Sequence, residues 1–87
     1  MKAIVTGAVN ATEEELCALR SMGLEITLHP DERQAVEHPE QYEAVLCNGL
    51  FLYNDISRFT GLRYIQLTSA GYDRVPMEYA RDHHVTV

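Results

Sequence analysis

Hydrophobic residues occur along this chain in short runs that are separated by longer polar segments. Residues 2–6 form a short run whose central positions, Ala3, Ile4 and Val5, are apolar in succession, which predicts a buried strand of a parallel sheet. Residues 24–28 alternate between apolar and polar positions, which predicts a half-buried strand near an edge. Residues 44–47 and 63–67 predict two further strands, and residues 85–87 predict the beginning of a fifth.

The polar segment after the first predicted strand carries the signals of a helix. Thr12 is placed to cap its beginning, and Glu15, three residues further on, is placed to bond back to the cap. Leu16, Leu19 and Met22 recur at helical spacing and predict one apolar face. Gly23 predicts the C-terminal end of the helix.

Three later segments predict shorter helices. Residues 32–37 have room for a short helix, which Pro39 would end. A single turn is expected before Gly61, with either Asn54 or Asp55 as its cap. Pro76 suits the first position of a helix that runs to about residue 83.

Strands and helices therefore alternate along the whole chain, which is typical of an α/β fold. We expect one parallel sheet of about five strands with helices on both faces. Because the chain stops inside the fifth predicted strand, we interpret residues 1–87 as a single domain that is truncated at its C-terminus.

Length and charge narrow the classes of function. The 87 residues are enough for one domain, and seven basic against thirteen acidic residues give a net charge of −6. This charge argues against nucleic acid and anionic membrane surfaces as partners. No apolar run is long enough for a membrane span, and the N-terminus lacks the pattern of a signal peptide, so we expect a cytoplasmic protein.

The segment TGAVNAT, residues 6–12, resembles loops that hold phosphate groups before a helix. However, it lacks a G-x-G-x-x-G motif, and Glu13, Glu14 and Glu15 would place three negative charges where a phosphate would bind. We therefore interpret the segment as a capping loop. Adjacent helical residues point about 100° apart, so these glutamates are not expected to share a metal ion.

Cysteine and histidine residues give no strong signal of catalysis or metal binding. Cys17 and Cys47 have no neighbouring ligand spacing and are interpreted as small buried hydrophobic residues. His83 and His84 are neighbours at a predicted helix end, where the helix dipole favours positive charge. No Ser/His/Asp or Cys/His arrangement emerges.

The loop after the fourth predicted strand is the best candidate for a binding site. In open α/β sheets, ligands bind beyond the carboxyl ends of the strands. Ser69, Ala70 and Gly71 are small residues at such an end, and their backbone N–H groups would suit a small carboxylate. A plain turn at Gly71 explains the same residues, so both interpretations stay open on physical grounds.

The segment GLRYIQLTSAGYDRVPMEYARDHHVTV resembles the N-terminal domain of NAD-dependent D-isomer-specific 2-hydroxyacid dehydrogenases. This family includes D-lactate, D-3-phosphoglycerate and glyoxylate/hydroxypyruvate enzymes. The resemblance is strong from Gly61 onward and weaker before it. It rests on an L-K/R-x-I strand, a loop of small residues ending in Gly, an Asp two residues later, and a helix leading into V-x-V. These positions are Leu62, Arg63, Ile65, Ser69-Ala70-Gly71, Asp73 and Val85 to Val87.

The resemblance implies a flavodoxin-like substrate-binding domain, with NAD bound by a second, Rossmann-type domain. It implies that the loop at Ser69, Ala70 and Gly71 binds the carboxylate of a small 2-hydroxy or 2-keto acid through the backbone N–H groups of Ala70 and Gly71. It further implies that the loop after the third strand contributes apolar contacts to the substrate. Its candidates are Leu50, Phe51 and Tyr53, for which packing beneath the loop is an equally good explanation.

Two departures from the family pattern affect these expectations. His84 stands where the family has glycine at the helix end, a left-handed position that histidine tolerates less well. The family's catalytic Arg, Glu and His and its glycine-rich NAD-binding loop have no counterpart in residues 1–87. We therefore expect no catalytic residue, no bound NAD and no metal in this chain, and no activity by the chain alone.

A second interpretation comes from a different class of protein. The chain would be a stand-alone α/β interaction or assembly module without a ligand. An incomplete sheet with one bare face tends to pair with another copy, so we expect a homo-oligomer formed through the truncated sheet.

Overall fold

The computed structural model describes residues 1–68 and 75–87, which form an α/β fold around a parallel sheet. The order across the sheet is β2-β1-β3-β4, and each neighbouring pair is parallel. The predicted α/β class is therefore confirmed for the part of the chain that the structure describes. The strands are β1 (Lys2–Thr6), β2 (Glu25–His29), β3 (Ala44–Cys47) and β4 (Tyr64–Leu67).

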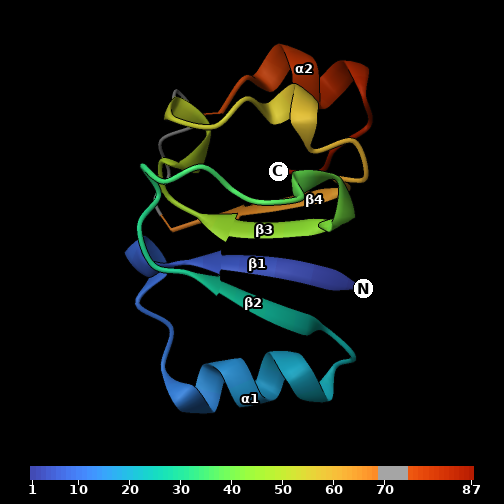
Figure 1. Ribbon diagram of the computed structural model, residues 1–87. Coiled ribbons are helices and arrows are strands. Elements are labelled where there is room, and N and C mark those ends of the chain that lie inside the picture. The colour runs from blue at the N-terminus through green and yellow to red at the C-terminus, as the bar shows by residue number, and fades with distance from the viewer. Residues whose placement is uncertain (69–74) are drawn as a thin grey trace.

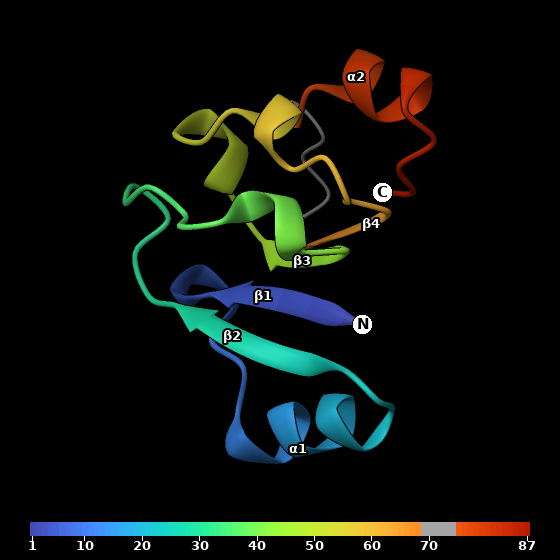
Figure 2. The same ribbon diagram turned by 45° about the vertical axis from the view of Figure 1, so that its right-hand side comes forward.

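Within residues 1–68 and 75–87, two α-helices and several short 3₁₀ turns link or flank the strands. Figures 1 and 2 show α1 and α2 at opposite ends of the molecule, with the sheet between them. None of the helices described is long and apolar enough to cross a membrane. The helices are α1 (Glu13–Ser21) and α2 (Met77–Asp82), and the 3₁₀ turns are η1 (Gly7–Val9), η2 (Pro39–Gln41), η3 (Leu50–Leu52) and η4 (Ile56–Arg58).

One face of the sheet carries the main hydrophobic core. Ile4, Val45 and Ile65 are paired across β1, β3 and β4, so their side chains point to the same face. All three are buried, and Ala80 of α2 belongs to the same cluster. The other buried members are Val36, Tyr42, Cys47, Leu50, Ile56, Phe59, Leu62, Val75 and Val85.

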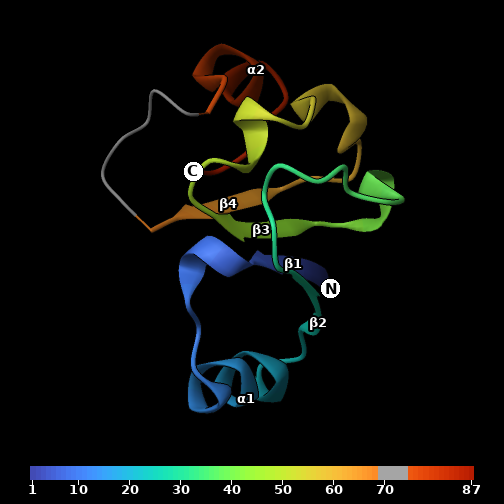
Figure 3. The same cartoon turned by 60° about the vertical axis from the view of Figure 1, so that its left-hand side comes forward.

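On the opposite face α1 contacts β2, and Figure 3 shows it beside that strand and far from β4. Val5 points to this face and is buried, and so is Leu16 of α1. Leu28 is paired with Val5 but remains 54% exposed, and Tyr64 at the far side of the sheet is 47% exposed. Among the described residues, the cover over this face is therefore incomplete at both β2 and β4.

The predicted beginning and end of α1 are confirmed, but its apolar face is shorter than expected. The Thr12 hydroxyl accepts the Glu15 N–H at 3.1 Å, and the Glu15 carboxylate accepts the Thr12 N–H at 3.2 Å, which forms a capping box. Gly23 follows the helix with φ +94°. Met22 is 76% exposed because the helix ends at Ser21, so its expected place on the buried face is wrong.

The short helix expected at residues 32–37 is also wrong, since these residues form turns, bends and irregular backbone. Side-chain hydrogen bonds from elsewhere occupy the backbone groups that a helix would use. The Val36 N–H donates to the Asn54 side chain, which in turn donates to the carbonyl oxygens of Glu32 and Gln34. Asp55, rather than Asn54, caps the next turn by accepting the Ser57 N–H at 2.9 Å.

The predicted fifth strand is not confirmed as a strand. Thr86 forms an isolated parallel bridge with Tyr64, through an Ile65 N–H bond to the Thr86 carbonyl oxygen at 2.7 Å. This places Thr86 on the side of β4 away from β3. The last predicted helix is confirmed as α2, but Pro76 precedes the helix as its N-cap, so its expected place as the first helical residue is wrong.

Candidate functional site

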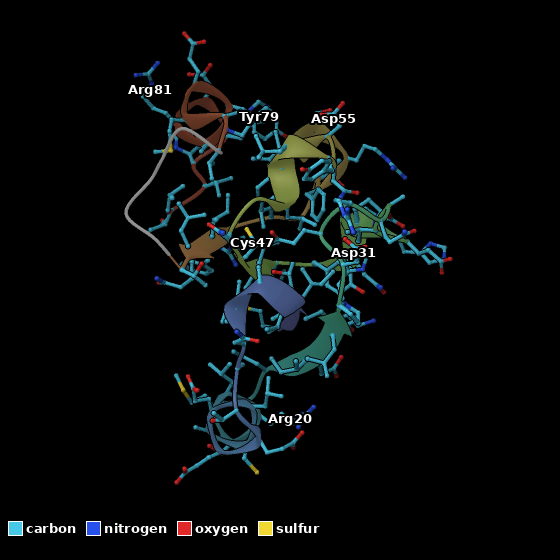
Figure 4. All side chains as sticks on the ribbon, turned by 90° about the vertical axis from the view of Figure 1, so that its left-hand side faces the viewer. Arg20, Asp31, Cys47, Asp55, Tyr79 and Arg81 are labelled. Carbon is cyan, nitrogen blue, oxygen red and sulfur yellow. The ribbon has the colours of Figure 1, made fainter. Side chains whose placement is uncertain are left out.

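The carboxyl ends of β1 and β3 lie side by side in the middle of the sheet. The chain leaves β1 toward β2 on one side and leaves β3 toward β4 on the other. Such a reversal of strand order is where open α/β sheets commonly bind ligands. Figure 4 faces this edge of the sheet and shows Cys47 at the end of β3, with Asp31 on the loop that follows β2.

The carboxylate of Glu32 occupies the crevice between these two strand ends. Its Oε2 atom accepts the Thr6 hydroxyl at 2.7 Å and the Asn48 N–H at 2.8 Å, and its Oε1 atom accepts the Gly49 N–H at 2.9 Å. Thr6 is only 1% exposed and Gly49 is buried. A charged side chain from the loop after β2 thus joins the ends of β1 and β3.

Asn54 ties the same two loops together from the other side. It is 7% exposed, and its side-chain oxygen accepts the Val36 N–H at 2.9 Å. Its Nδ2 atom donates to the carbonyl oxygen of Glu32 at 3.3 Å and to that of Gln34 at 3.1 Å. Residues 48–54, here called the 48–54 loop, are therefore bonded at both ends to the segment around Glu32.

The sequence alone does not identify Glu32 or Asn54 as a site residue. Its pattern predicts a short helix around Glu32 and offers Asn54 only as a cap. The signals present are Thr6, a polar residue ending a buried strand, and Asn48-Gly49, which ends the next buried strand. Both indicate polar backbone and side-chain groups that need partners, but neither indicates which residue supplies them.

The structure separates the three candidates in the 48–54 loop. Leu50 is fully buried in the core. Phe51 packs edge-on against Phe59, with ring centroids 5.3 Å apart, and is half-buried. Tyr53 is 59% exposed, so it alone of the three presents most of its ring to solvent. The carboxylate-binding candidates Ser69, Ala70 and Gly71 lie outside the residues that the structure describes.

Tyr53 lines an open pocket of about 510 Å³ together with Glu32 and the adjoining residues. Arg33 and Asp31 form a two-pronged ion pair in this pocket, with both nitrogen–oxygen distances at 3.2 Å. Hydrogen bonds from Arg33 hold the pKa of the Asp31 carboxyl below its ordinary value. Because the pair is exposed to solvent, it contributes little to stability. The remaining lining residues are Ala8 and Pro30.

Gly7 brings the loop after β1 close to the loop after β2. A Cβ atom at this position would collide with the carbonyl oxygen of Pro30. Together with the capping box at Thr12, this contact explains the TGAVNAT segment as packing and capping. The expected capping role of Thr12 is therefore confirmed.

The two cysteines differ from each other. Cys47 is 1% exposed, and burial raises its pKa to about 12, so its thiol is not a ready nucleophile. Cys17 is exposed on α1, so its interpretation as a buried residue is wrong. Its thiol is therefore the more accessible of the two.

The histidine pair lies at the end of α2. The ring of His83 stacks on that of Tyr79 with centroids 3.9 Å apart, and its Nδ1 atom lies 3.0 Å from the Tyr79 carbonyl oxygen. His84 adopts the left-handed conformation with φ 57°, as the departure from glycine predicted. Within residues 1–68 and 75–87, no cluster of three or more His, Cys, Asp or Glu side chains is arranged to hold a metal ion.

The geometry thus combines an internally bonded carboxylate at the centre of the sheet edge with a partly exposed pocket beside it. Comparison with protein-family models, with curated proteins and with solved structures finds no match to this chain.

Proposed function

We propose that this chain is the substrate-binding part of an NAD-dependent D-2-hydroxyacid dehydrogenase and has a flavodoxin-like fold. The strand order β2-β1-β3-β4, with Thr86 alongside the outer side of β4, supports the order 2-1-3-4-5 of that fold. In this proposal the chain binds a small 2-hydroxy or 2-keto acid. The partner domain supplies NAD and the catalytic residues.

The observation that carries the proposal is where β4 ends. The Thr68 N–H donates to the Cys47 carbonyl oxygen at 3.1 Å. Thr68, the last residue described before 69–71, therefore lies beside the start of the 48–54 loop. The two segments that the family resemblance assigns to the substrate begin at neighbouring strand ends, on the edge where open α/β sheets bind ligands.

The crevice between β1 and β3 supports the same assignment by exclusion. Glu32 already bonds to the Asn48 and Gly49 N–H groups and brings a negative charge to this crevice. A second carboxylate placed there would meet like-charge repulsion at close range. The proposal therefore assigns the substrate carboxylate to Ala70 and Gly71, the residues of the family resemblance, and not to this crevice.

The test is a titration of the isotope-labelled chain with oxamate, a stable analogue of a 2-keto acid, followed by NMR. We expect the largest shifts at the backbone amides of Ala70 and Gly71, with smaller shifts at Tyr53. Sodium chloride at the same ionic strength serves as the control. Equal shifts with both salts, or oxamate shifts confined to other parts of the chain, would contradict the proposal.

Activity provides an independent check. The chain alone is expected to give no NADH-dependent reduction of pyruvate or hydroxypyruvate, because it lacks the family's acid/base residues and its NAD-binding loop. Turnover above that of a buffer control would refute this part of the proposal.

An assembly module is the second candidate, and exposed apolar side chains favour it. Leu28 and Tyr64 lie on the sheet face that α1 leaves partly open, and Met1 is 44% exposed at the start of β1. Pairing of this face in a homodimer would remove Leu28 and Tyr64 from water. Sedimentation of the wild type at high micromolar concentration tests this, with the Leu28→Lys variant as the comparison. A monomeric wild type would exclude the assembly module.

A further inference from the structure

The donors around the Glu32 carboxylate are those that proteins use to bind free anions. A hydroxyl group and two consecutive backbone N–H groups converge on its two oxygens, at distances of 2.7 to 2.9 Å. Consecutive N–H groups at the carboxyl end of a strand make a concave site for a carboxylate or phosphate. In this chain, the anion at that site is one of its own side chains.

Glu32 also contacts the far end of the 48–54 loop. Its backbone carbonyl oxygen accepts the Asn54 Nδ2 at 3.3 Å, while its carboxylate binds the N–H groups of Asn48 and Gly49. One residue therefore bonds to both ends of this segment. Leu50 and Phe51 lie between these two attachments and pack into the core beneath.

We infer that Glu32 is a positioning residue: its carboxylate fills the crevice between β1 and β3 as a built-in anion and fixes the conformation of the 48–54 loop. Because the Glu32 carboxylate fills the crevice, an external anion cannot bind there. Tyr53 is held at the surface of the adjoining pocket. The effect of the 48–54 loop on substrate choice rests on the function proposed above.

The charge of Glu32 matters as much as its shape. Hydrogen bonds from N–H or O–H groups to a carboxylate are about twice as strong as those to a neutral acceptor. Glutamine at this position would also turn an NH₂ group toward either the Gly49 N–H or the Thr6 and Asn48 donors. At least one donor would then lose its acceptor in a largely buried place, which is costly.

The first test follows the amide signals of Asn48 and Gly49 in the full 87-residue chain by NMR. In Glu32→Gln we expect both signals to move to the positions of weaker hydrogen bonds and to lose hydrogen-exchange protection. Glu32→Asp, which keeps the charge, is expected to recover part of the wild-type behaviour. Glu37→Gln removes the charge of an exposed glutamate nearby and is the matched control. Unchanged Asn48 and Gly49 amides in Glu32→Gln would overturn the inference.

The second test removes the whole side chain and supplies the anion from solution. Formate added to Glu32→Gly is expected to restore the Asn48 and Gly49 signals toward their wild-type positions, whereas sodium chloride at equal ionic strength is not. Formate that acts no better than chloride would show that the crevice does not recognise a carboxylate. Should Glu32→Gly fail to fold, the comparison of Glu32→Gln, Glu32→Asp and Glu37→Gln still decides the matter.

The third test asks whether the loop position affects ligand choice. Glyoxylate has no side chain, whereas α-ketoisocaproate carries a branched apolar one that would reach the 48–54 loop. In Glu32→Gln we expect binding of α-ketoisocaproate to weaken by about tenfold relative to glyoxylate, as displaced apolar contacts typically cost. An equal loss of affinity for both acids would refute a role of Glu32 in the choice between them.

These arms separate the two proposals from each other. If the wild type binds neither keto acid, the proposed function fails. The amide signals and the formate experiment still test whether Glu32 positions the 48–54 loop. If the wild type binds both acids but the Asn48 and Gly49 amide signals are the same in the Glu32 variants as in the wild type, the positioning role fails and the proposed function stands.

Discussion

The side-chain oxygen of Asn54 accepts the backbone N–H of Val36 at 2.9 Å, and both residues are buried. This bond joins two loops that lie 18 residues apart in the chain. It satisfies a backbone donor that has no partner from regular secondary structure, and burial of such a donor without an acceptor is costly.

Replacing Asn54 by alanine is expected to lower the free energy of unfolding by roughly 1–3 kcal/mol, because the Val36 N–H stays buried without this acceptor. Urea denaturation measures the change. Gln34→Ala, which shortens an exposed amide side chain on the same loop, is the control and should stay within about 0.5 kcal/mol of wild type. An Asn54→Ala variant as stable as this control would contradict the role of the bond.

The strands and α1 could be predicted because their signals are local. Residues 3–5 and 44–47 are continuous apolar runs, and they lie within β1 and β3. The Thr12 and Glu15 pair lies within one helical turn, so its spacing alone predicts the capping box that forms. In these segments the signal that predicts the element lies within a few consecutive residues, even though the strands pair with remote partners.

Glu32 and Asn54 could not be predicted because their partners are remote. Glu32 meets donors that lie 26, 16 and 17 residues away, at Thr6, Asn48 and Gly49. In the sequence alone, a glutamate between an aspartate and an arginine is typical of a solvated loop. Only the parallel pairing of β1 with β3 brings its three donors together, and that pairing is a property of the sheet order.

His84 ends α2 in the same way as Gly23 ends α1. In both places the residue is left-handed, and the next residue donates its N–H back to the last turn of the helix, from Val85 to Ala80 and from Leu24 to Leu19. We expect His84→Gly to raise the free energy of unfolding by roughly 0.5–1 kcal/mol, because glycine removes the Cβ strain at positive φ. Thermal unfolding measures the gain.

His83 provides the matched control for this variant. It has φ −108° and stacks on Tyr79, so His83→Gly relieves no strain and loses a contact. It is expected to destabilise the chain. A destabilising His84→Gly, or equal effects of the two variants, would show that the left-handed backbone is not the cause.

The two thiols are expected to react with a thiol reagent at very different rates. Cys17 is exposed and should be labelled in the native chain at about pH 8, whereas Cys47, with its pKa raised to about 12 by burial, should be labelled only on unfolding. Mass spectrometry counts the labels. Cys17→Ser is expected to leave a native chain without rapid labelling, and rapid labelling of that variant would contradict the burial of Cys47.

The raised pKa of Cys47 also predicts how stability depends on alkaline pH. The unfolded thiol ionises near its ordinary pKa of 9.0, and the folded thiol at about 12. Its contribution is therefore fully present below pH 9.0 and falls as the pH rises from 9.0 to about 12. Urea unfolding across this range should show a decline that is smaller in Cys47→Ala than in the wild type. Equal slopes would contradict the prediction.

Gly7 is expected to be a poorly replaceable glycine. Gly7→Ala would drive its Cβ atom into the carbonyl oxygen of Pro30, and neither backbone segment can yield without moving the loop that carries Glu32. We expect a loss of roughly 1–3 kcal/mol in the free energy of unfolding. Because Glu32 follows Pro30 closely in the chain, the amide signals of Asn48 and Gly49 should shift as well.

Gly23→Ala separates this steric effect from backbone strain. Gly23 has φ +94°, and no atom lies within 4 Å of the place that an added Cβ would take, so alanine there costs only the strain of the left-handed conformation, about 1–2 kcal/mol. Its effect on the amide signals should stay near the end of α1 and leave Asn48 and Gly49 unchanged. If Gly7→Ala likewise leaves those two amides unchanged, the contact between Gly7 and Pro30 does not position Glu32.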